Sequence, residues 1–486
     1  MKLGEMSILC QWLSRKLTIL LVFCISVTCS SKDLTPFDFG LTEALSNIER
    51  YEVIFKTHQE ALKLGVDVDY SGIDELHIEI PKGATPIPLS KRTDFKGLKL
   101  YVSNYSNNQY LFTRVQRPSP IDITKDEFVS GTYVSRPEMR KGTYLLVVED
   151  MTPWVDKREG YTYGFLRKDV VLISGAKAKN THVMPYLSAT SNPRFSYLKV
   201  DNDGYVKNLE FYRTENSTYK TFLFQINWQN GFCVENVSIY TPDTKFHGDA
   251  AISVSNCTNT LLKDICIQGT YSQSNKYGYG ISLDNVWNTK IVNICSNCKW
   301  GVFGNNNVNK CTLKNCKINR FDVHCYGRDI YMQDCCFSGM YNQFSSVFGT
   351  VSYKRCVFDN QRPCLIESSY NAYTGFNLNY EKCTFMMNKN KCELVFLMDV
   401  PQKINSRPEL ALKCLPNVRL KKCSFFFEED LDEWFIFRAG NKKIETPVGY
   451  VSSIDISDAK MLREVKCHIS NFNLTTMNEV EFQYKR

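Results

Sequence analysis

The sequence has no cysteine between Cys29 and Cys233, although 17 of its 20 cysteines follow that gap. An odd number in an exported chain would argue against a complete disulfide framework. Histidine is scarce, with six residues, and neither sign of charge dominates, because the formal net charge is only +8. That modest excess favours an anionic partner without naming one. Apolar residues make up 43% of the chain, which excludes a largely disordered protein.

Long apolar runs are also lacking, apart from one near the N-terminus. Arg15 and Lys16 precede an apolar run over residues 17–27 that is too short for a comfortable membrane span. We therefore predict a signal peptide over residues 1–28 and an exported protein that is periplasmic, on the cell surface or secreted. The stretch SVTCSSKD resembles a bacterial lipobox, in which case Cys29 is lipidated and tethers the protein to a membrane. An ordinary signal peptidase site near the same place is the alternative.

Short segments around the cysteines repeat along the second half of the chain. Each has one or two polar residues followed by an apolar residue or cysteine, as in LKDICI, LKNCKI and YKRCVF. The repeated position falls at residues 237, 265, 294, 316, 335, 356, 383, 423 and 467. Units of roughly 20–30 residues with period-two alternation are typical of a β-solenoid. We predict a parallel β-helix with a column of buried cysteines and with corner asparagines at Asn236, Asn256, Asn285, Asn293, Asn307 and Asn315.

The region before these repeats resembles the N-terminal segment with which the proteins of a known superfamily begin their first coil. LTEALSNIERYEVIFKTHQEALKLG is predicted to form an amphipathic helix, and VDVDYSGIDELHIEIPKGATPIPL a strand followed by a turn at Pro81 and Gly83. Over residues 60–475 the chain is similar to the pectate-lyase-like right-handed β-helix proteins, and RFDVH resembles a motif of secreted and phage-associated members. The resemblance implies an all-β, right-handed parallel β-helix over residues 67–475. It also implies a capping helix region at 34–66, at the N-terminal end of the β-helix. Residues 476–486 then form a C-terminal tail.

The stretch KINRFDVHCYGRD, residues 317–329, carries polar side chains at alternate positions. Successive side chains of a β-strand point to opposite faces. With Phe321, Val323 and Cys325 in the interior, the polar residues between them face outward as one row. We predict that this row is catalytic, and the set is His324, Arg320, Tyr326, Arg328 and Asp322. A solvated strand face is the alternative.

Two of the longer coils carry extra residues at the same point, over 240–249 and 269–280. Insertions at one point of adjacent coils stack into a wall, which in repeat proteins is often the binding face. Tyrosines can stack on sugar rings, and lysines attract carboxylate or sulfate groups. The predicted substrate-binding set is Lys245, His247, Asp249, Lys276, Tyr277, Tyr279, Asp284 and Glu367. The alternative for the two insertions is a pair of polar loops without a function.

No metal or cofactor follows from the residues. Cys295, Cys298, Cys311 and Cys316 have a spacing that resembles a zinc site, but Cys316 already belongs to the predicted column. A disulfide between Cys295 and Cys298 is equally unsupported. The metal stays unassigned and no cofactor is required. Calcium is implied only by the resemblance, because some β-helix polysaccharide lyases use it.

The resemblance to exported bacterial polysaccharide lyases favours β-elimination on a uronic-acid polysaccharide, best a glycosaminoglycan of the chondroitin sulfate or hyaluronan type. Arg320 or Arg328 would neutralise the sugar carboxylate, and His324 would take the C5 proton. Tyr326 would protonate the leaving oxygen, and Asp322 would orient a neighbouring group or bind a cation.

Two other functions remain open at this stage. One is glycoside hydrolysis by carboxylates from the set Asp249, Asp284, Asp322 and Glu367, although the polygalacturonase-like pattern is missing. The other is a surface protein that binds glycans without catalysis. The sequence contains no basic-aromatic nucleic-acid module, and we expect a monomer whose only membrane contact is the lipid anchor.

Overall fold

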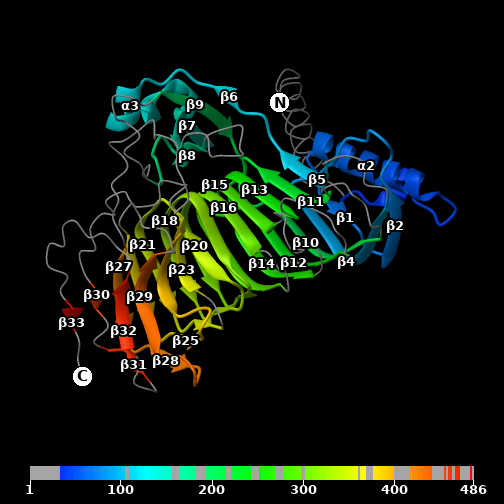
Figure 1. Cartoon of the computed structure of the whole chain (residues 1–486). Helices are drawn as coiled ribbons and strands as arrows, with labels where there is room; N and C mark the ends of the chain where they lie inside the picture. The colour runs from blue at the N-terminus through cyan, green and yellow to red at the C-terminus, as the bar shows by residue number, and fades with distance from the viewer. Residues whose placement is uncertain are drawn as a thin grey trace, which may run out of the picture.

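The computed structural model describes residues 33–103, 109–155, 165–180, 192–214, 221–241, 251–268, 279–296, 301–359, 362–367, 376–398, 416–439, 454–455, 458–461, 466–470 and 482–483. Parallel strands wind into one long cylinder, so the predicted right-handed parallel β-helix is confirmed (Figure 1). No helix in the described ranges is long and apolar enough to cross a membrane. The predicted signal peptide and Cys29 lie outside those ranges.

One face of the cylinder, called the site face below, consists of the strand that begins each coil. Neighbouring members pair in parallel along the whole length of the cylinder. The face contains β3 (Ile87–Pro88), β5 (Gln109–Val115), β11 (Thr221–Asn227), β13 (Ile252–Thr258), the first halves of β15 (Tyr279–Ser296), β16 (Gly301–Lys314) and β18 (Phe321–Gln333), then β20 (Tyr341–Phe344), β23 (Arg362–Glu367), β26 (Glu393–Met398), β29 (Glu433–Ala439) and β32 (Lys466–Ser470).

The remaining strands and the second halves of β15, β16 and β18 form the rest of the wall. They are β1 (Val68–Asp69), β2 (Glu75–Glu79), β4 (Arg92–Ser103), β10 (Tyr205–Arg213), β12 (Cys233–Tyr240), β14 (Leu261–Gln268), β17 (Lys317–Ile318), β19 (Cys336–Phe337), β21 (Val347–Lys354), β22 (Val357–Phe358), β24 (Asn377–Glu381), β25 (Thr384–Met387), β27 (Asn417–Lys421), β28 (Ser424–Phe427), β30 (Ile454–Asp455), β31 (Lys460–Met461) and β33 (Phe482–Gln483).

The corners of the coils are made by residues in the left-handed backbone conformation. All six predicted corner asparagines have positive φ, between 50° and 56°, and the prediction is confirmed. Asparagine tolerates this conformation because its short side chain hydrogen-bonds locally. Asn285 Nδ2 donates to Asn256 Oδ1 over 2.8 Å, and Asn256 Nδ2 donates to Asn227 Oδ1 over 3.2 Å. These amides form a ladder that fixes the stacking of successive coils.

The predicted cysteine column is present just after one of these corners. Its thiols are buried and unpaired as disulfides, and each donates to the carbonyl oxygen two residues earlier over 3.2–3.6 Å. A small, weakly polar side chain therefore both fills the core and satisfies a corner carbonyl. The column contains Cys316, Cys335, Cys356, Cys383 and Cys423.

The assignment of Cys467 to this column is wrong. Cys467 pairs with Trp434 of β29 and so belongs to the site face. The coil after Cys423 instead continues the column's wall through the short strand β31, which pairs with β28. The long spacing between Cys423 and Cys467 concealed this extra strand.

The N-terminal end of the cylinder is closed as predicted by a helix. After the turn η1 (Pro36–Phe39), α2 (Asn47–Leu64) begins at the capping box of Ser46 and Glu49 and ends at Gly65, whose φ is +70°. Its apolar side packs on β2 and β3, and the buried His58 Nε2 lies 2.9 Å from Tyr70 Oη. An uncovered end would expose the core and unpaired strand edges, which this helix prevents.

An antiparallel sheet interrupts the solenoid that the sequence predicts across residues 67–475, and it lies within residues 85–200, where the repeat is faint and the sequence leaves a second domain open. It has strand order β6 (Ser119–Pro120), β9 (Pro193–Lys199), β7 (Thr143–Val155), β8 (Phe165–Ser174), with α3 (Lys125–Ser130), η2 (Thr132–Ser135) and η3 (Pro137–Met139) on one side. Alternate residues of β7 face two separate apolar clusters. One cluster includes Trp228 of the cylinder, so the insert is packed onto the coils rather than loosely tethered.

Strand β8 of the insert lies against β13, β15, β16 and β18, just beyond one end of the site-face strands (Figure 1). The Lys168 backbone N–H donates to Asn307 Oδ1 over 3.0 Å, and Lys168 Nζ lies 3.5 Å from Asp284 Oδ2. Asp150 and Arg167 form a fully buried ion pair of 2.6 Å inside the insert. The insert therefore covers one corner of the central coils next to the site face.

Candidate active site

Strand β18 departs from regular alternation within the predicted catalytic stretch. Its register with β16 pairs Asn305 with Val323 but Asn306 with Cys325, which leaves His324 as an extra residue. Such a bulge re-aims the side chains around it. The imidazole of His324 lies on the outside of the cylinder, on the same side as Asp322, with 17% of the side chain exposed, and the residues after it are the ones that the bulge displaces.

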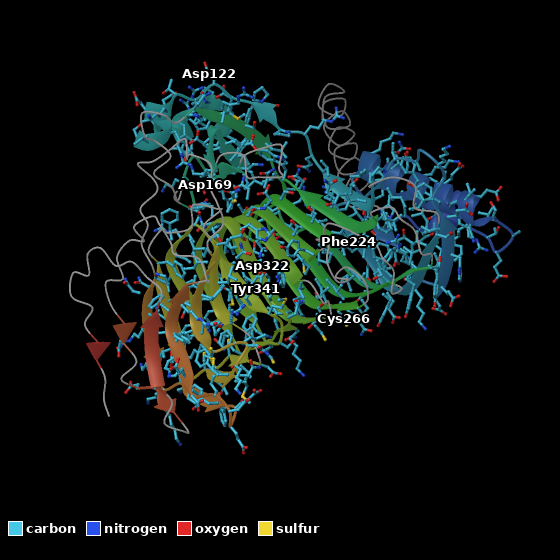
Figure 2. The ribbon with its side chains drawn as sticks, viewed as in Figure 1. Asp122, Asp169, Phe224, Cys266, Asp322 and Tyr341 are labelled. Carbon is cyan, nitrogen blue, oxygen red and sulfur yellow. The ribbon has the colours of Figure 1, made fainter. Side chains whose placement is uncertain are left out.

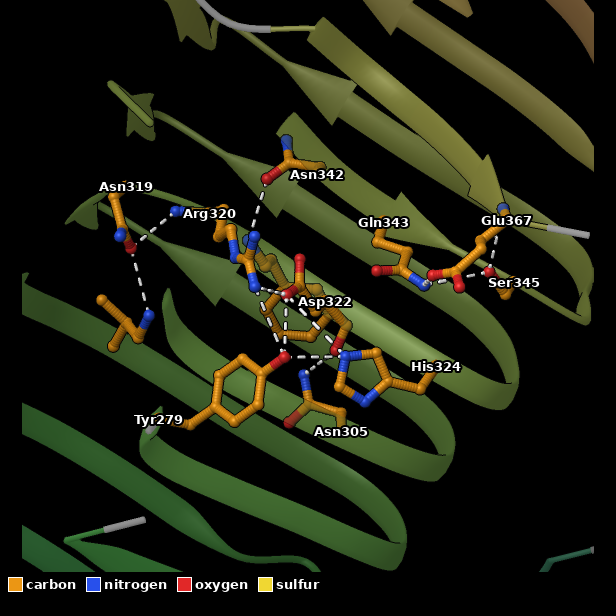
Figure 3. Close-up of polar contacts among 12 residues, drawn as sticks. Tyr279, Asn305, Asn319, Arg320, Asp322, His324, Asn342, Gln343, Ser345 and Glu367 are labelled. Atoms are coloured by element: carbon orange, nitrogen blue, oxygen red, sulfur yellow. Dashed lines mark hydrogen bonds and ion pairs between the residues drawn. The ribbon is translucent and has the colours of Figure 1, made fainter. Parts of the chain in front are cut away.

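Four side chains, one from β15, two from β18 and Arg320 immediately before β18, converge at this bulge (Figure 3). Tyr279 of β15 extends over the intervening strand β16, and its hydroxyl lies 2.8 Å from His324 Nε2. The same hydroxyl lies 3.3 Å from Asp322 Oδ2 and 3.4 Å from Arg320 Nη2. Arg320 and Asp322 form an ion pair of 2.7 Å and are essentially inaccessible to solvent. The imidazole and the phenol form the outer layer of the cluster, and the ion pair lies beneath them.

Two glycines on β16 provide the surface on which the Tyr279 ring rests. A Cβ added at Gly304 would overlap the Tyr279 ring, and one at Gly301 would lie 2.8 Å from Arg320 Nε and 3.0 Å from the Tyr279 ring. Any larger residue would need the ring to move. Neither glycine was predicted from the sequence, although the GVFG spacing places both on the strand between Tyr279 and Asp322.

Burial and charge set the protonation behaviour of the ion pair. Loss of solvent raises the pKa of Asp322 to about 6, although Arg320 and Tyr279 partly offset the increase. Burial alone would lower the pKa of Arg320, but Asp322 and the neighbouring tyrosines hold it above its usual value. Arg320 therefore stays charged, and Asp322 titrates in a range where its loss of charge can be observed.

A second carboxylate lies further along the site face, on β23. Gln343 of β20 pairs with Asp322 in the strand register, and its Nε2 donates to Glu367 Oε2 over 3.2 Å. The Glu367 backbone N–H donates to Ser345 Oγ over 3.3 Å. Because Gln343 pairs with Leu365, Glu367 lies two strands from Asp322 and two residues further along, roughly 12 Å between backbones at the usual strand spacing and rise. The charge of Glu367 contributes to the raised pKa of Asp322.

Aromatic rings enclose the guanidinium of Arg320. Its Cζ lies 4.7 Å from the Tyr341 ring centroid and 5.8 Å from that of Tyr279. Figure 2 labels Asp322 and Tyr341 next to each other on the central coils. Arg320 therefore lacks the exposure needed to grip a sugar carboxylate directly, which corrects that part of the predicted role. Its remaining role is to fix and polarise the groups above it.

Tyr326 does not join the cluster, contrary to the predicted row. It occupies the corner position that Asn285 and Asn307 fill in earlier coils, with a φ of +80°, and is buried. A bulky residue in this conformation is unusual. The bulge at His324 shifts the alternation, so Cys325 leaves the interior cluster and Tyr326 turns into the corner beside the insert. Tyr326 is therefore not placed to act as the predicted acid.

Two further predicted residues are also separate from the cluster. Arg328 lies beyond the corner and forms a half-exposed ion pair of 3.4 Å with Asp329. Asp284 contacts the insert through Lys168 and accepts from Asn307 Nδ2 over 3.2 Å. The predicted residues that the structure does bring together are Tyr279, Arg320, Asp322 and His324, with Glu367 linked through Gln343.

The loop residues predicted to bind substrate cannot be compared in the same way. Lys245, His247, Asp249, Lys276 and Tyr277 lie outside the described residues. Among the described residues, no group of three or more His, Cys, Asp or Glu side chains is arranged to hold a metal ion. Cys311 and Cys316 of the considered zinc set are buried in the core.

Comparison with known proteins supports the fold. No protein-family model matches the chain, and no curated protein matches it. The tailspike protein gp49 from Pseudomonas phage LKA1 is similar in structure, with a TM-score of 0.50, 10% identity, and coverage of 88% of this chain and 84% of that chain.

Two other solved tailspikes have lower scores. The gp54 tailspike of Acinetobacter baumannii bacteriophage AP22, solved with a capsular saccharide, has a TM-score of 0.49 and 12% identity, and covers 92% of this chain and 79% of its own. The gp61 tailspike of Pseudomonas phage phi297 has a TM-score of 0.45 and 11% identity, with 85% and 81% covered. The chain is a right-handed parallel β-helix protein with a polar cluster on one outer face.

Proposed function

We propose that this protein is a polysaccharide lyase that cleaves a uronic-acid-containing anionic polysaccharide by β-elimination. The supporting observation is the Tyr279 hydroxyl 2.8 Å from His324 Nε2, above the buried Arg320–Asp322 ion pair. The substrate class that we propose is a glycosaminoglycan of the chondroitin sulfate or hyaluronan type. Tyr279 replaces Tyr326 as the acid in this proposal.

The two outer groups divide the proton transfers. If His324 Nε2–H donates to Tyr279 Oη, and the Tyr279 hydroxyl in turn donates to Asp322, then Nδ1 of His324 carries the lone pair of the base. His324 takes the proton from C5 of the uronate, the electron pair of that C–H bond forms the C4–C5 double bond, and the C4–O bond breaks. The leaving oxygen takes the Tyr279 proton. Arg320 stabilises the resulting phenolate, which then recovers a proton from the imidazolium.

A second candidate, glycoside hydrolysis, is favoured by the two carboxylates. Asp322 and Glu367 lie two strands and two residues apart, roughly 12 Å between backbones, and inverting glycosidases hold their two carboxyl groups about 6.5–9.5 Å apart. The raised pKa of Asp322, about 6, suits a general acid. Burial of Asp322 beneath Tyr279 is the reason for ranking hydrolysis second, because a general acid must reach the glycosidic oxygen.

The test is incubation with hyaluronan, chondroitin sulfate, polygalacturonate and neutral dextran. Elimination produces an unsaturated uronate that absorbs in the ultraviolet. Hydrolysis produces reducing ends without that absorbance, and a glycan-binding protein produces neither. We expect absorbance from an acidic polymer and a loss of about a hundredfold to ten-thousandfold in His324→Ala and Tyr279→Phe.

Matched controls come from the same residue types elsewhere on the surface. Tyr331 is exposed on the other half of β18, and His77 is exposed and stacked on Tyr101 at 4.5 Å. Tyr331→Phe and His77→Ala should keep full activity. Reducing ends without ultraviolet absorbance would replace the lyase proposal by hydrolysis.

An extracellular polymer as substrate requires export of the protein. The proposed signal peptide at residues 1–28 and lipidation at Cys29 belong to this proposal. Expression of the full chain and of Cys29→Ala, followed by separation of membranes from soluble material, tests the anchor. Membrane association that survives in Cys29→Ala would exclude lipidation at this residue.

A further inference from the structure

The site face continues beyond the polar cluster as a strip of arginines and aromatic rings. Tyr341 of β20 pairs in register with Arg362, the first residue of β23. On the next strands, Phe396 of β26 pairs with Arg438 of β29. We call Arg362, Glu393, Phe396, Phe435 and Arg438 the arginine strip. It begins one strand beyond the Tyr341 ring that covers Arg320.

Each arginine of the strip is held in place by a ring and a shared carboxylate. The Cζ of Arg362 lies 4.4 Å from the Phe396 ring centroid, and that of Arg438 lies 4.7 Å from the Phe435 centroid. Arg362 Nε lies 2.9 Å from Glu393 Oε2, and Arg438 Nη1 lies 3.0 Å from Glu393 Oε1. Glu393 is buried, whereas the arginine side chains are 25% and 33% exposed. Both guanidinium groups are therefore ordered but accessible.

These contacts leave donors on both arginines for another acceptor. Beyond Glu393, Arg362 uses Nη2 to donate to the Asn390 carbonyl over 3.2 Å. Arg438 uses Nη1 again, toward Cys392 Sγ over 3.6 Å. Nη1 of Arg362 and Nη2 of Arg438 have no hydrogen bond within the described part of the chain. A planar guanidinium with free N–H groups is suited to carboxylate or sulfate oxygens.

The strip also carries more positive than negative charge. Two arginines flank one carboxylate, and Lys391 lies close by, donating from Nζ to the Gly339 carbonyl over 3.1 Å. Burial lowers the pKa of Lys391, and the charge of Arg362 lowers it further. Like charges held this close favour the arrival of an anion.

We infer that the arginine strip binds an acidic group, carboxylate or sulfate, on a sugar further along the chain than the one that reacts at His324, because the strip is centred three strands, or roughly 14 Å, from His324. The inference deepens the proposed function and relies on it only for the polymeric nature of the ligand. A bound chain would then run along the axis of the cylinder, from Tyr279 past Tyr341 to Arg438. Aromatic rings between the cations give the sugar rings apolar surfaces to contact.

A purely structural network around Glu393 is the competing explanation. Removing one arginine would then destabilise the fold, because a buried carboxylate loses a partner. Glu393→Gln separates the two explanations, since it removes the shared carboxylate and releases both arginines. The variants Arg362→Gln and Arg438→Gln are therefore made in the Glu393→Gln background, where no buried charge is left unpaired.

Binding is measured by affinity electrophoresis in full-length protein that also carries His324→Ala, so that turnover does not interfere. The probes are hyaluronan (carboxylate only), dextran sulfate (sulfate only) and neutral dextran. We expect Glu393→Gln to bind at least one acidic probe about fivefold more tightly. Each added arginine substitution should weaken that binding about five- to tenfold, more at low salt. Arg355→Gln is the matched control, because Arg355 forms an exposed pair with Asp334 at a different corner.

The outcomes keep this inference separate from the proposed function. Equal affinity in all variants with an intact fold, or no binding of either acidic probe, overturns the arginine strip as a subsite. Binding that depends on the strip, in a protein whose unmodified form makes no elimination product, supports the subsite and rejects the lyase. Preference for dextran sulfate over hyaluronan identifies sulfate as the recognised group, and the reverse preference identifies carboxylate.

Discussion

The coils before residue 270 and those from Tyr279 to Glu367 follow the same path but differ in regularity. In the earlier coils, β12 and β14 pair residue for residue across the corner, as in Val237 with Ile265. In the later coils, the register slips at His324, again near Arg328, and between Tyr341 and Gln343, whereas the slip in the earlier coils, between Lys207 and Leu209, lies away from the site face. Buried charges are found on the site face of the later coils at Arg320, Asp322 and Glu367, whereas Gly304, Ser282 and Ser253 fill the position of Asp322 in the preceding coils.

This difference separates residues that only stack from residues of the proposed active site. A position that only stacks needs one shape in every coil, so its sequence repeats and its register is uniform. A position that orients a proton or a sugar needs a particular atom at a particular place. In the proposed active site, the bulge at His324 and the paired glycines under Tyr279 break the repeat for this reason, and the corner tyrosine at 326 is a consequence of that bulge.

The largest expected effect comes from filling the space beneath Tyr279. In Gly304→Val the new side chain occupies the position of the Tyr279 ring, which must swing away from His324. We expect activity on the acidic polymer to fall by at least about a hundredfold, because the acid–base pair is separated. Initial rates of unsaturated uronate formation measure this.

The control for this substitution lies one coil earlier. Ser282 pairs with Gly304 in the register and already has a side chain at the same column. Ser282→Ala should keep activity within about twofold. Full activity in a folded Gly304→Val protein would show that Tyr279 need not occupy its place for catalysis.

The second effect is on the pH dependence of the reaction. Asp322, with a pKa raised by burial to about 6, must be ionised to hold Arg320 and accept from Tyr279. Activity should therefore fall about tenfold for each pH unit below about 6. In Asp322→Asn the rate should be low at every pH and should keep only the acid limb that comes from protonation of the His324 base. An unchanged acid limb in that variant would assign the titration to another group.

The raised pKa of Asp322 also determines the direction in which the free energy of unfolding changes with pH. The folded pKa of Asp322 lies above that of an unfolded aspartate, so the folded chain holds this proton more tightly. Its contribution is fully present below about pH 4 and is lost as the pH rises through about 6. Urea unfolding across this interval, compared with Asp322→Asn, isolates the contribution of this single carboxyl group.

The fold followed from the sequence because stacking leaves a visible pattern. Cys335, Cys356 and Cys383 occupy one column, and each follows a residue with positive φ, so their spacing records the length of a coil. The insert over residues 119–199 has no such repeat. Its strands pair antiparallel, and nothing in a solenoid pattern indicates where a different sheet interrupts it.

The site was only half predictable, for a different physical reason. Arg320, Asp322 and His324 stood out as rare polar residues on one strand. Which of their neighbours join them depends on a register slip of one residue, and such a slip cannot be inferred from alternation alone. Regular alternation therefore placed Tyr326 in the row and gave no indication that Tyr279 contacts His324 across the intervening strand β16.

A smaller effect, on stability and not on activity, is expected from substitutions at Asn256 in the coils before residue 270. Asn256 has a φ of +51°, donates to Asn227 and accepts from Asn285. Asn256→Ala removes both ladder hydrogen bonds and strains the backbone, and should lower the free energy of unfolding by about 1–3 kcal/mol. Asn256→Gly also removes both hydrogen bonds but relieves the strain, so it should unfold at higher urea than Asn256→Ala. Activity should remain in both, and its loss would contradict the division between the two regions.

The smallest effect is expected at Tyr326, the residue that the sequence placed in the row and the structure places in a corner. Its hydroxyl is buried and has no hydrogen-bond partner among the described residues, and burial raises its pKa. Removing an unsatisfied buried hydroxyl costs little, so Tyr326→Phe should leave stability unchanged or raise it by up to about 1 kcal/mol. Activity should also be unchanged, in contrast to Tyr279→Phe in the same assay. A large loss in Tyr326→Phe with normal activity in Tyr279→Phe would return the acid role to the corner tyrosine, and the bulge at His324 would then need a different explanation.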